Sequence, residues 1–180
     1  MARLTQIQDT DAGARTAEIF AAIRGKIGMV PNLYRVAANQ PAVLNALLGA
    51  NDAIAKGGFD ARDREAIALA VAGRNGCDYC ASAHAAISAS LKVDDKTVYD
   101  HLSGVSSDPR LQAILQLAVA VVESKGRVDD SDLAAARAAG LSEADIVETV
   151  GNVVVNIFTN YLNHVADTDI DFPLRRAAAA

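Results

Sequence analysis

Residues 64–84 read REAIALAVAGRNGCDYCASAH, and this stretch contains both cysteines and one of the three histidines of the chain. Apolar side chains at helical spacing over residues 62–73, with Asp60 before them as a cap, predict a first helix. Residues 74–76, Arg-Asn-Gly, interrupt that pattern, and an alanine-rich pattern over residues 78–91 predicts a second helix. We therefore expect an antiparallel helix hairpin that closes through a tight turn.

The hairpin is expected to bring a carboxylate and an imidazole together. Residues equally far from the turn face each other, and Glu65 and His84 both lie roughly 14 Å from it at a rise of about 1.5 Å per residue. Cys80 lies one helical turn before His84, on the same face. A thiol, an imidazole and an orienting carboxylate form the arrangement expected of an activated cysteine. We predict that Glu65 orients His84, that His84 exchanges protons and that Cys80 acts as a thiolate.

The two cysteines form a C-x-x-C motif at the start of the predicted second helix. The unpaired backbone N–H groups and the helix dipole at that end favour a negative sulfur over a neutral thiol. The three-residue step also allows a disulfide between Cys77 and Cys80 to open and close locally. Two other interpretations stay open, in which these are ordinary buried residues or the two thiols, His84 and Glu65 bind zinc. Zinc is disfavoured because ligands on adjacent turns of one helix crowd one side of the ion.

The motif resembles the core signature of the AhpD-like alkylhydroperoxidases, within the carboxymuconolactone decarboxylase superfamily. The residues that carry this resemblance are Glu65, Cys77, Asp78, Tyr79, Cys80 and His84. Residues 30–34 followed by Gln40 and Pro41, and residues 169–173, are similar to the upstream and tail segments of its peroxidase-related branch. The resemblance thus extends over nearly the whole chain.

The resemblance implies an all-helical homo-oligomer with dithiol peroxidase activity. In this family pattern Cys80 is oxidised to a sulfenic acid, Cys77 resolves it as a disulfide, and Glu65 and His84 form a proton relay. An external dithiol, on a protein or of the lipoyl type, then reduces the disulfide. Tyr79 departs from the pattern, since the best studied members carry a second histidine between the cysteines. A phenol, which ionises only near pH 10, serves poorly as a cation or base beside the thiolates, so we expect a slower peroxide reaction.

Length and composition predict one domain with its own core. The chain has 180 residues, of which 51% are hydrophobic. No segment shows the alternation of a strand, so we expect an all-α, AhpD-like fold without a β-sheet over residues 1–180. Within this domain we distinguish an N-terminal segment (1–40), the core motif (65–84) and a C-terminal tail (165–180). The net charge of −5 and the lack of a Lys/Arg cluster argue against nucleic acid or an anionic membrane as a partner.

Targeting and cofactor signals are also informative. Residues 1–13 contain no apolar run of the signal-peptide type, and the longest apolar stretch, residues 113–122, is too short to span a bilayer. We therefore expect a cytoplasmic protein, and in that reducing compartment a C-x-x-C motif indicates a redox or metal device. No glycine-rich, phosphate-cradling loop is present, so no flavin or nicotinamide cofactor is expected.

The remaining apolar patterns predict further helices. His101 is expected at a solvated edge, and residues 177–180 are expected to fray. The predicted helices cover residues 14–26, 42–56, 94–102, 109–125, 130–139 and 142–164, with a loop and a short helix over 29–35.

The last predicted helix carries polar side chains every four residues, Asn152, Asn156, Asn160 and His164, through an otherwise apolar sequence. Buried amides need hydrogen-bond partners. One interpretation is that they bond to neighbouring helix ends or across a subunit interface. The other is that Asn160 or His164 lines the pocket over Cys80 and binds a peroxide or substrate oxygen.

Together these observations predict a peroxidase that reduces organic or hydrogen peroxides through a Cys77/Cys80 dithiol–disulfide cycle. Two alternatives remain. One is a protein disulfide oxidoreductase or redox sensor with little peroxidase activity. The other is a noncatalytic helical assembly or metal-binding module.

Overall fold

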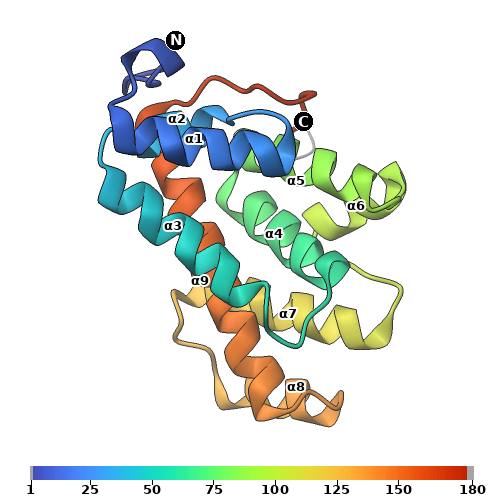
Figure 1. Ribbon diagram of the computed structural model, residues 1–180. Coiled ribbons are helices and arrows are strands. Elements are labelled where there is room, and N and C mark those ends of the chain that lie inside the picture. The colour runs from blue at the N-terminus through green and yellow to red at the C-terminus, as the bar shows by residue number, and fades with distance from the viewer. Residues whose placement is uncertain (1, 178–180) are drawn as a thin grey trace.

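The computed structural model describes residues 2–177, and within that range the chain forms helices and no strand. Figure 1 shows α4 (Ala61–Asn75) inside the molecule, where it packs against four other helices. These are α5 (Asp78–Ser90), α6 (Asp95–Leu102), α7 (Pro109–Ser124) and α9 (Glu143–Ala166). The other elements are the 3-10 turn η1 (Asp9–Asp11), α1 (Ala14–Ile27), α2 (Asn32–Ala37), α3 (Pro41–Ile54) and α8 (Asp130–Ala138).

The all-α expectation is confirmed for the part of the chain that the structure describes. Each predicted long helix is present, with its ends moved by a residue or two. Across residues 2–177, none of these helices is long and apolar enough to cross a membrane.

The hairpin predicted from residues 64–84 is present as α4 and α5. Asp60 caps α4, because its Oδ1 accepts hydrogen bonds from the backbone N–H groups of Arg62 (2.7 Å) and Asp63 (2.9 Å). Gly76 ends α4 in the left-handed region, with φ of 65°, a conformation that glycine adopts without side-chain strain. The middle of α4 is buried, so the hairpin is part of the core.

A second glycine of α4 sets how closely α6 approaches. A Cβ atom at Gly73 would lie 2.0 Å from the backbone oxygen of Leu102, at the end of α6. The end of α6 therefore packs directly on the backbone of α4. His101 is buried in this contact region, so its expected place at a solvated edge is wrong.

The C-terminal tail, residues 167–177, packs on the helices instead of fraying. It leaves the end of α9 and runs back across the molecule toward α5, as the red segment of Figure 1 shows. Ala177 is buried, and its N–H donates to Asp78 Oδ1 at 2.9 Å. The prediction of a frayed end is therefore wrong for Ala177, and residues 178–180 lie outside the described residues.

Candidate active site

The C-x-x-C motif lies at the junction of the hairpin turn and α5. Cys77 is the N-cap residue of α5, and its Sγ accepts a hydrogen bond from the backbone N–H of Cys80 at 3.2 Å. The two cysteines are joined as a disulfide, with their Cα atoms 5.3 Å apart. Cys77 is 1% exposed and Cys80 is 2% exposed. The two sulfur atoms therefore lie inside the protein, at a helix N-terminus that favours negative charge.

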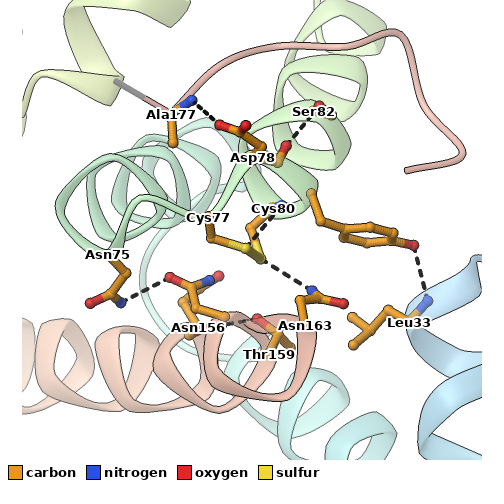
Figure 2. Close-up of a disulfide and its surroundings, with 12 residues drawn as sticks. Leu33, Asn75, Cys77, Asp78, Cys80, Ser82, Asn156, Thr159, Asn163 and Ala177 are labelled. Atoms are coloured by element: carbon orange, nitrogen blue, oxygen red, sulfur yellow. Dashed lines mark hydrogen bonds between the residues drawn. A yellow bond between two sulfur atoms is a disulfide. The ribbon is translucent and has the colours of Figure 1, made fainter. Parts of the chain in front are cut away.

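An asparagine of α9 contacts the disulfide. Asn163 Nδ2 donates to Cys80 Sγ at 3.3 Å, and Figure 2 shows its side chain pointing from α9 to the sulfur atoms. Asn163 is 4% exposed, and its Oδ1 has no hydrogen-bond partner among the described residues. The side chain thus presents one satisfied donor and one unsatisfied acceptor in a buried place.

Glu65 and His84 meet across the hairpin as expected from their distances to the turn. Glu65 Oε2 lies 2.7 Å from His84 Nδ1, and both side chains are largely buried. Burial alone would lower the pKa of His84, but the Glu65 charge and the hydrogen bonds that the ring makes to Glu65 and Asn156 outweigh it and raise this pKa above its usual value. The imidazole is therefore a stronger base than a free histidine.

The acid–base pair and the disulfide face different cavities. Glu65 and His84 line a cavity of about 250 Å³ between α3, α4, α5 and α9. Cys77 and Asn163 line a second cavity of about 390 Å³, closed in part by the C-terminal tail. His84 lies one turn after Cys80 on α5, but no hydrogen bond joins these two side chains in the described chain.

The chain is similar in sequence to a known protein family and in structure to solved proteins. Residues 41–103, which include the hairpin, match the model of the carboxymuconolactone decarboxylase family. A peroxidase-related protein with an alkylhydroperoxidase AhpD core from Ralstonia eutropha superposes with a TM-score of 0.84 at 22% identity, over 94% of this chain and 92% of that one. The chain has the AhpD-like fold.

Two further solved structures share this AhpD-like fold. A peroxidase-related protein from a Silicibacter species has a TM-score of 0.81 at 22% identity, over 93% of this chain and 89% of that chain. The debrominase Bmp8 in complex with 2,3,4-tribromopyrrole has a TM-score of 0.79 at 22% identity, over 94% and 91%. No curated protein matches the chain in sequence. The AhpD-like fold therefore occurs in proteins named for different reactions, and the fold alone does not determine the chemistry.

Tyr79, where the resemblance led us to expect a second histidine, anchors other segments of the chain. Its hydroxyl accepts from the backbone N–H of Leu33 at 3.0 Å and donates to Asp171 Oδ1 at 2.8 Å. Burial, with Asp171 nearby, raises the pKa of Tyr79, so the phenol stays neutral. Asp78, the other residue between the cysteines, accepts from Ala177 N–H and pairs with Arg176. Both residues inside the C-x-x-C motif thus hold the C-terminal tail.

The polar stripe on α9 has a structural explanation for most of its length. Asn160 is fully buried and its Oδ1 accepts from Asn75 Nδ2, at the end of α4, at 2.9 Å. Asn152 and Asn156 donate to backbone oxygens one turn earlier in α9. Asn160 thus bonds to the end of a neighbouring helix, as one interpretation predicted, although its Nδ2 has no partner among the described residues. Asn152 and Asn156 bond within their own helix instead.

The α9 residue that contacts Cys80 Sγ is Asn163. It is not one of the polar residues that recur every four positions. His164 is exposed and reaches only the cavity beside Cys77. Positions four apart drift around a helix that repeats every 3.6 residues, so the stripe leaves the buried face before it reaches Cys80. A count of i, i+3 and i+7 positions from Asn156 includes Asn163 and was the available signal.

Metal binding was the open alternative for these side chains. Within residues 2–177, no three His, Cys, Asp or Glu side chains are grouped so that they could hold a metal ion.

Proposed function

We propose that this AhpD-like protein is a thiol-dependent peroxidase that uses Cys77 and Cys80 as a dithiol–disulfide pair. The observation that carries the proposal is the hydrogen bond between Glu65 on α4 and His84 on α5, the helix whose first turn holds the two cysteines. It supplies a base of raised pKa one turn from Cys80. The helix N-terminus supports a thiolate at Cys80, against the burial of the site, which disfavours the charged form.

In the reaction, His84 removes the proton from the Cys80 thiol. The Cys80 thiolate attacks the distal oxygen of the hydroperoxide, the O–O bond breaks, and the proton held by His84 passes to the departing alkoxide. Cys80 is then a sulfenic acid and the product is an alcohol, or water when hydrogen peroxide is the substrate. Cys77 attacks the sulfenic sulfur, water leaves, and the disulfide forms. An external dithiol, on a protein or of the lipoyl type, returns two electrons.

The test is stopped-flow reaction of the prereduced protein with an organic hydroperoxide. Wild type should react much faster than a free thiol at the same pH, and Cys80→Ser should not react. His84→Ala should be slower by about 10²-fold, the usual range for loss of a general base. Cys77→Ser is the matched control, because it should consume one equivalent of peroxide and stop at a sulfenic acid that dimedone traps. A wild-type rate equal to that of a free thiol rules out peroxidase activity.

The same protein samples separate the competing functions. A slow peroxide reaction with rapid exchange against a protein dithiol would favour a disulfide oxidoreductase. Because a debrominase shares the fold, the reduced protein should also be incubated with 2,3,4-tribromopyrrole and assayed for bromide. Bromide release together with one disulfide per bromide, in place of peroxide consumption, would reassign the reaction as reductive debromination.

A further inference from the structure

The two sulfur atoms of the disulfide have different surroundings. Cys77 lines the cavity of about 390 Å³ beside the C-terminal tail, whereas Cys80 is not among the residues that line it. Cys80 instead receives the only side-chain amide donor that the described chain directs at either sulfur, from Asn163 at 3.3 Å. Figure 2 shows this donor on the α9 side of the disulfide, with Asp78 and Ala177 on the other side. The disulfide therefore faces a cavity at Cys77 and accepts an amide N–H at Cys80.

We propose that a reducing thiolate enters through this cavity and attacks Cys77 Sγ, while Asn163 holds Cys80 as the departing thiolate. The inference rests on the Cys77–Cys80 redox cycle of the proposed function, but not on peroxide as the oxidant. It assigns to Asn163 the role of a hydrogen-bond donor to the sulfur that gains charge.

The electrons and protons of the exchange balance as follows. The first thiolate of a dithiol reductant forms a bond to Cys77 Sγ, the Cys77–Cys80 bond breaks, and its electron pair stays on Cys80 Sγ. The second thiol of the reductant then attacks the reductant's first sulfur, which is bonded to Cys77 in the mixed disulfide. Cys77 is released and takes up the proton of that second thiol. The reductant leaves as a disulfide, and the protein holds a thiolate at Cys80 and a thiol at Cys77.

An N–H donor at Cys80 matters because the rate of thiol–disulfide exchange rises as the leaving thiolate becomes more stable. Hydrogen bonds to an ionised acceptor are stronger than those to a neutral one, so the bond from Asn163 strengthens as Cys80 gains charge. This is differential stabilisation, stronger after the bond breaks than before.

The unsatisfied oxygen of Asn163 supports the same assignment. Asn163 Oδ1 is buried without a donor while the cysteines are joined, and a buried acceptor without a donor is unfavourable. Cys77 lines the same cavity as Asn163. The thiol formed at Cys77 on reduction brings an S–H donor to the cavity that Asn163 also lines.

The first experiment titrates the Cys80 thiolate by its absorbance at 240 nm in a Cys77→Ser background. Replacing Asn163 by Leu should raise the midpoint of thiolate formation by about 1 pH unit, because the donor to the charged form is lost. Asn163→Asp provides a second variant of the same size without the N–H donor, and it should raise the midpoint too. Thr149→Val, a buried polar-to-apolar change elsewhere on α9, is the control. An unchanged midpoint in both Asn163 variants would overturn the role of Asn163.

The second experiment asks which sulfur is attacked. Cys80→Ser leaves Cys77 as the single thiol and Cys77→Ser leaves Cys80, and both variants are reacted with 5,5′-dithiobis(2-nitrobenzoate). Per thiolate, Cys77 should react at least about tenfold faster, because it faces the cavity. Equal or faster reaction at Cys80 would contradict entry at Cys77.

A third measurement tests attack at Cys77 and departure of Cys80 in the same reaction. Reduction of the oxidised protein by dithiothreitol should be about tenfold slower in Asn163→Leu than in wild type, and unchanged in Thr149→Val. Equal rates in wild type and Asn163→Leu would refute the leaving-group role. None of these assays contains peroxide, so failure of the peroxidase reaction and failure of this inference are separate results.

Discussion

The pKa of His84 is set by burial and by two neighbouring side chains, which act in opposite directions. Burial lowers its pKa, and the charge and hydrogen bond of Glu65, with the bond to Asn156, raise it further than burial lowers it. The carboxylate is thus more than an orienting group, because it decides how strong a base the imidazole is. This dependence can be measured at one residue.

Replacing Glu65 by Gln should move the His84 pKa down toward the usual value of about 6.5, since the amide keeps the shape but removes the charge. NMR titration of the histidine ring protons in wild type and Glu65→Gln measures this shift. The peroxide rate at neutral pH should fall with it, by about tenfold or more, because a weaker base takes the Cys80 proton less well. Glu123→Gln, an exposed carboxylate that pairs with Arg74, is the control. A His84 pKa that stays the same or rises in Glu65→Gln would contradict this account.

The contact between α4 and α6 requires glycine at position 73, because a side chain there would meet the backbone of α6. Gly73→Ala would place a Cβ atom 2.0 Å from the Leu102 backbone oxygen, and a backbone atom cannot turn away as a side chain can. We expect the free energy of unfolding to fall by about 1–3 kcal/mol or more, the usual cost of overpacking. Gly25→Ala in α1 is the matched control, because its Cβ meets nothing within 4 Å and alanine favours a helix by about 0.5–1 kcal/mol. Urea denaturation of both variants checks the difference, and equal stability would contradict the close approach of α6.

The C-terminal tail is held by the residue between the cysteines that was expected to affect only the peroxide rate. Tyr79→Phe should lower the free energy of unfolding by about 1–3 kcal/mol, since it removes the donor to Asp171 and leaves Leu33 N–H unpaired. Hydrogen exchange of residues 167–177 should become faster, while exchange in the middle of α9 stays the same. The exposed Tyr161→Phe should change stability by less than about 0.5 kcal/mol. Unchanged exchange in the tail would mean that its other contacts suffice to hold it.

The elements that sequence reasoning located well are those whose contacts follow from local geometry. Glu65 and His84 meet because a tight turn and two regular helices fix their separation, and no distant part of the chain is needed. Asn163 was missed because a count of every fourth residue departs from the true helical repeat over the length of α9. The packing of the tail was missed for a different reason. An extended segment has no periodicity, and the hydrogen bond from Tyr79 to Asp171 spans 92 residues.

At the scale of the whole molecule, two histidines couple stability to pH in opposite directions. The pKa of His84 is raised on folding, so the folded state holds this proton more tightly than the unfolded chain does. The pKa of His101 is lowered, because burial outweighs the charges of Asp100, Asp63 and Asp94, so the unfolded chain binds this proton more tightly. His84 stabilises the folded state, fully below about pH 6.5, and this stabilisation is lost as the pH rises through the pKa that His84 has in the folded protein. His101 destabilises the folded state as the pH falls below about 6.5 toward the lowered pKa that this residue has in the folded protein.

These opposite signs predict that the two histidines together give a maximum of stability near pH 6.5. Measured by urea denaturation from pH 5 to pH 8.5, the difference between wild type and His84→Gln should shrink above pH 6.5, because wild type alone loses the ion pair with Glu65. Below pH 6.5, wild type should become progressively less stable than His101→Gln. The reason is that only wild type gains a proton at residue 101 when unfolding exposes the imidazole. Each slope is bounded by about 1.4 kcal/mol per pH unit for one proton, and His164→Gln, at an exposed position, is the control. Slopes of the same sign for the two variants would contradict the opposite environments that the fold gives these residues.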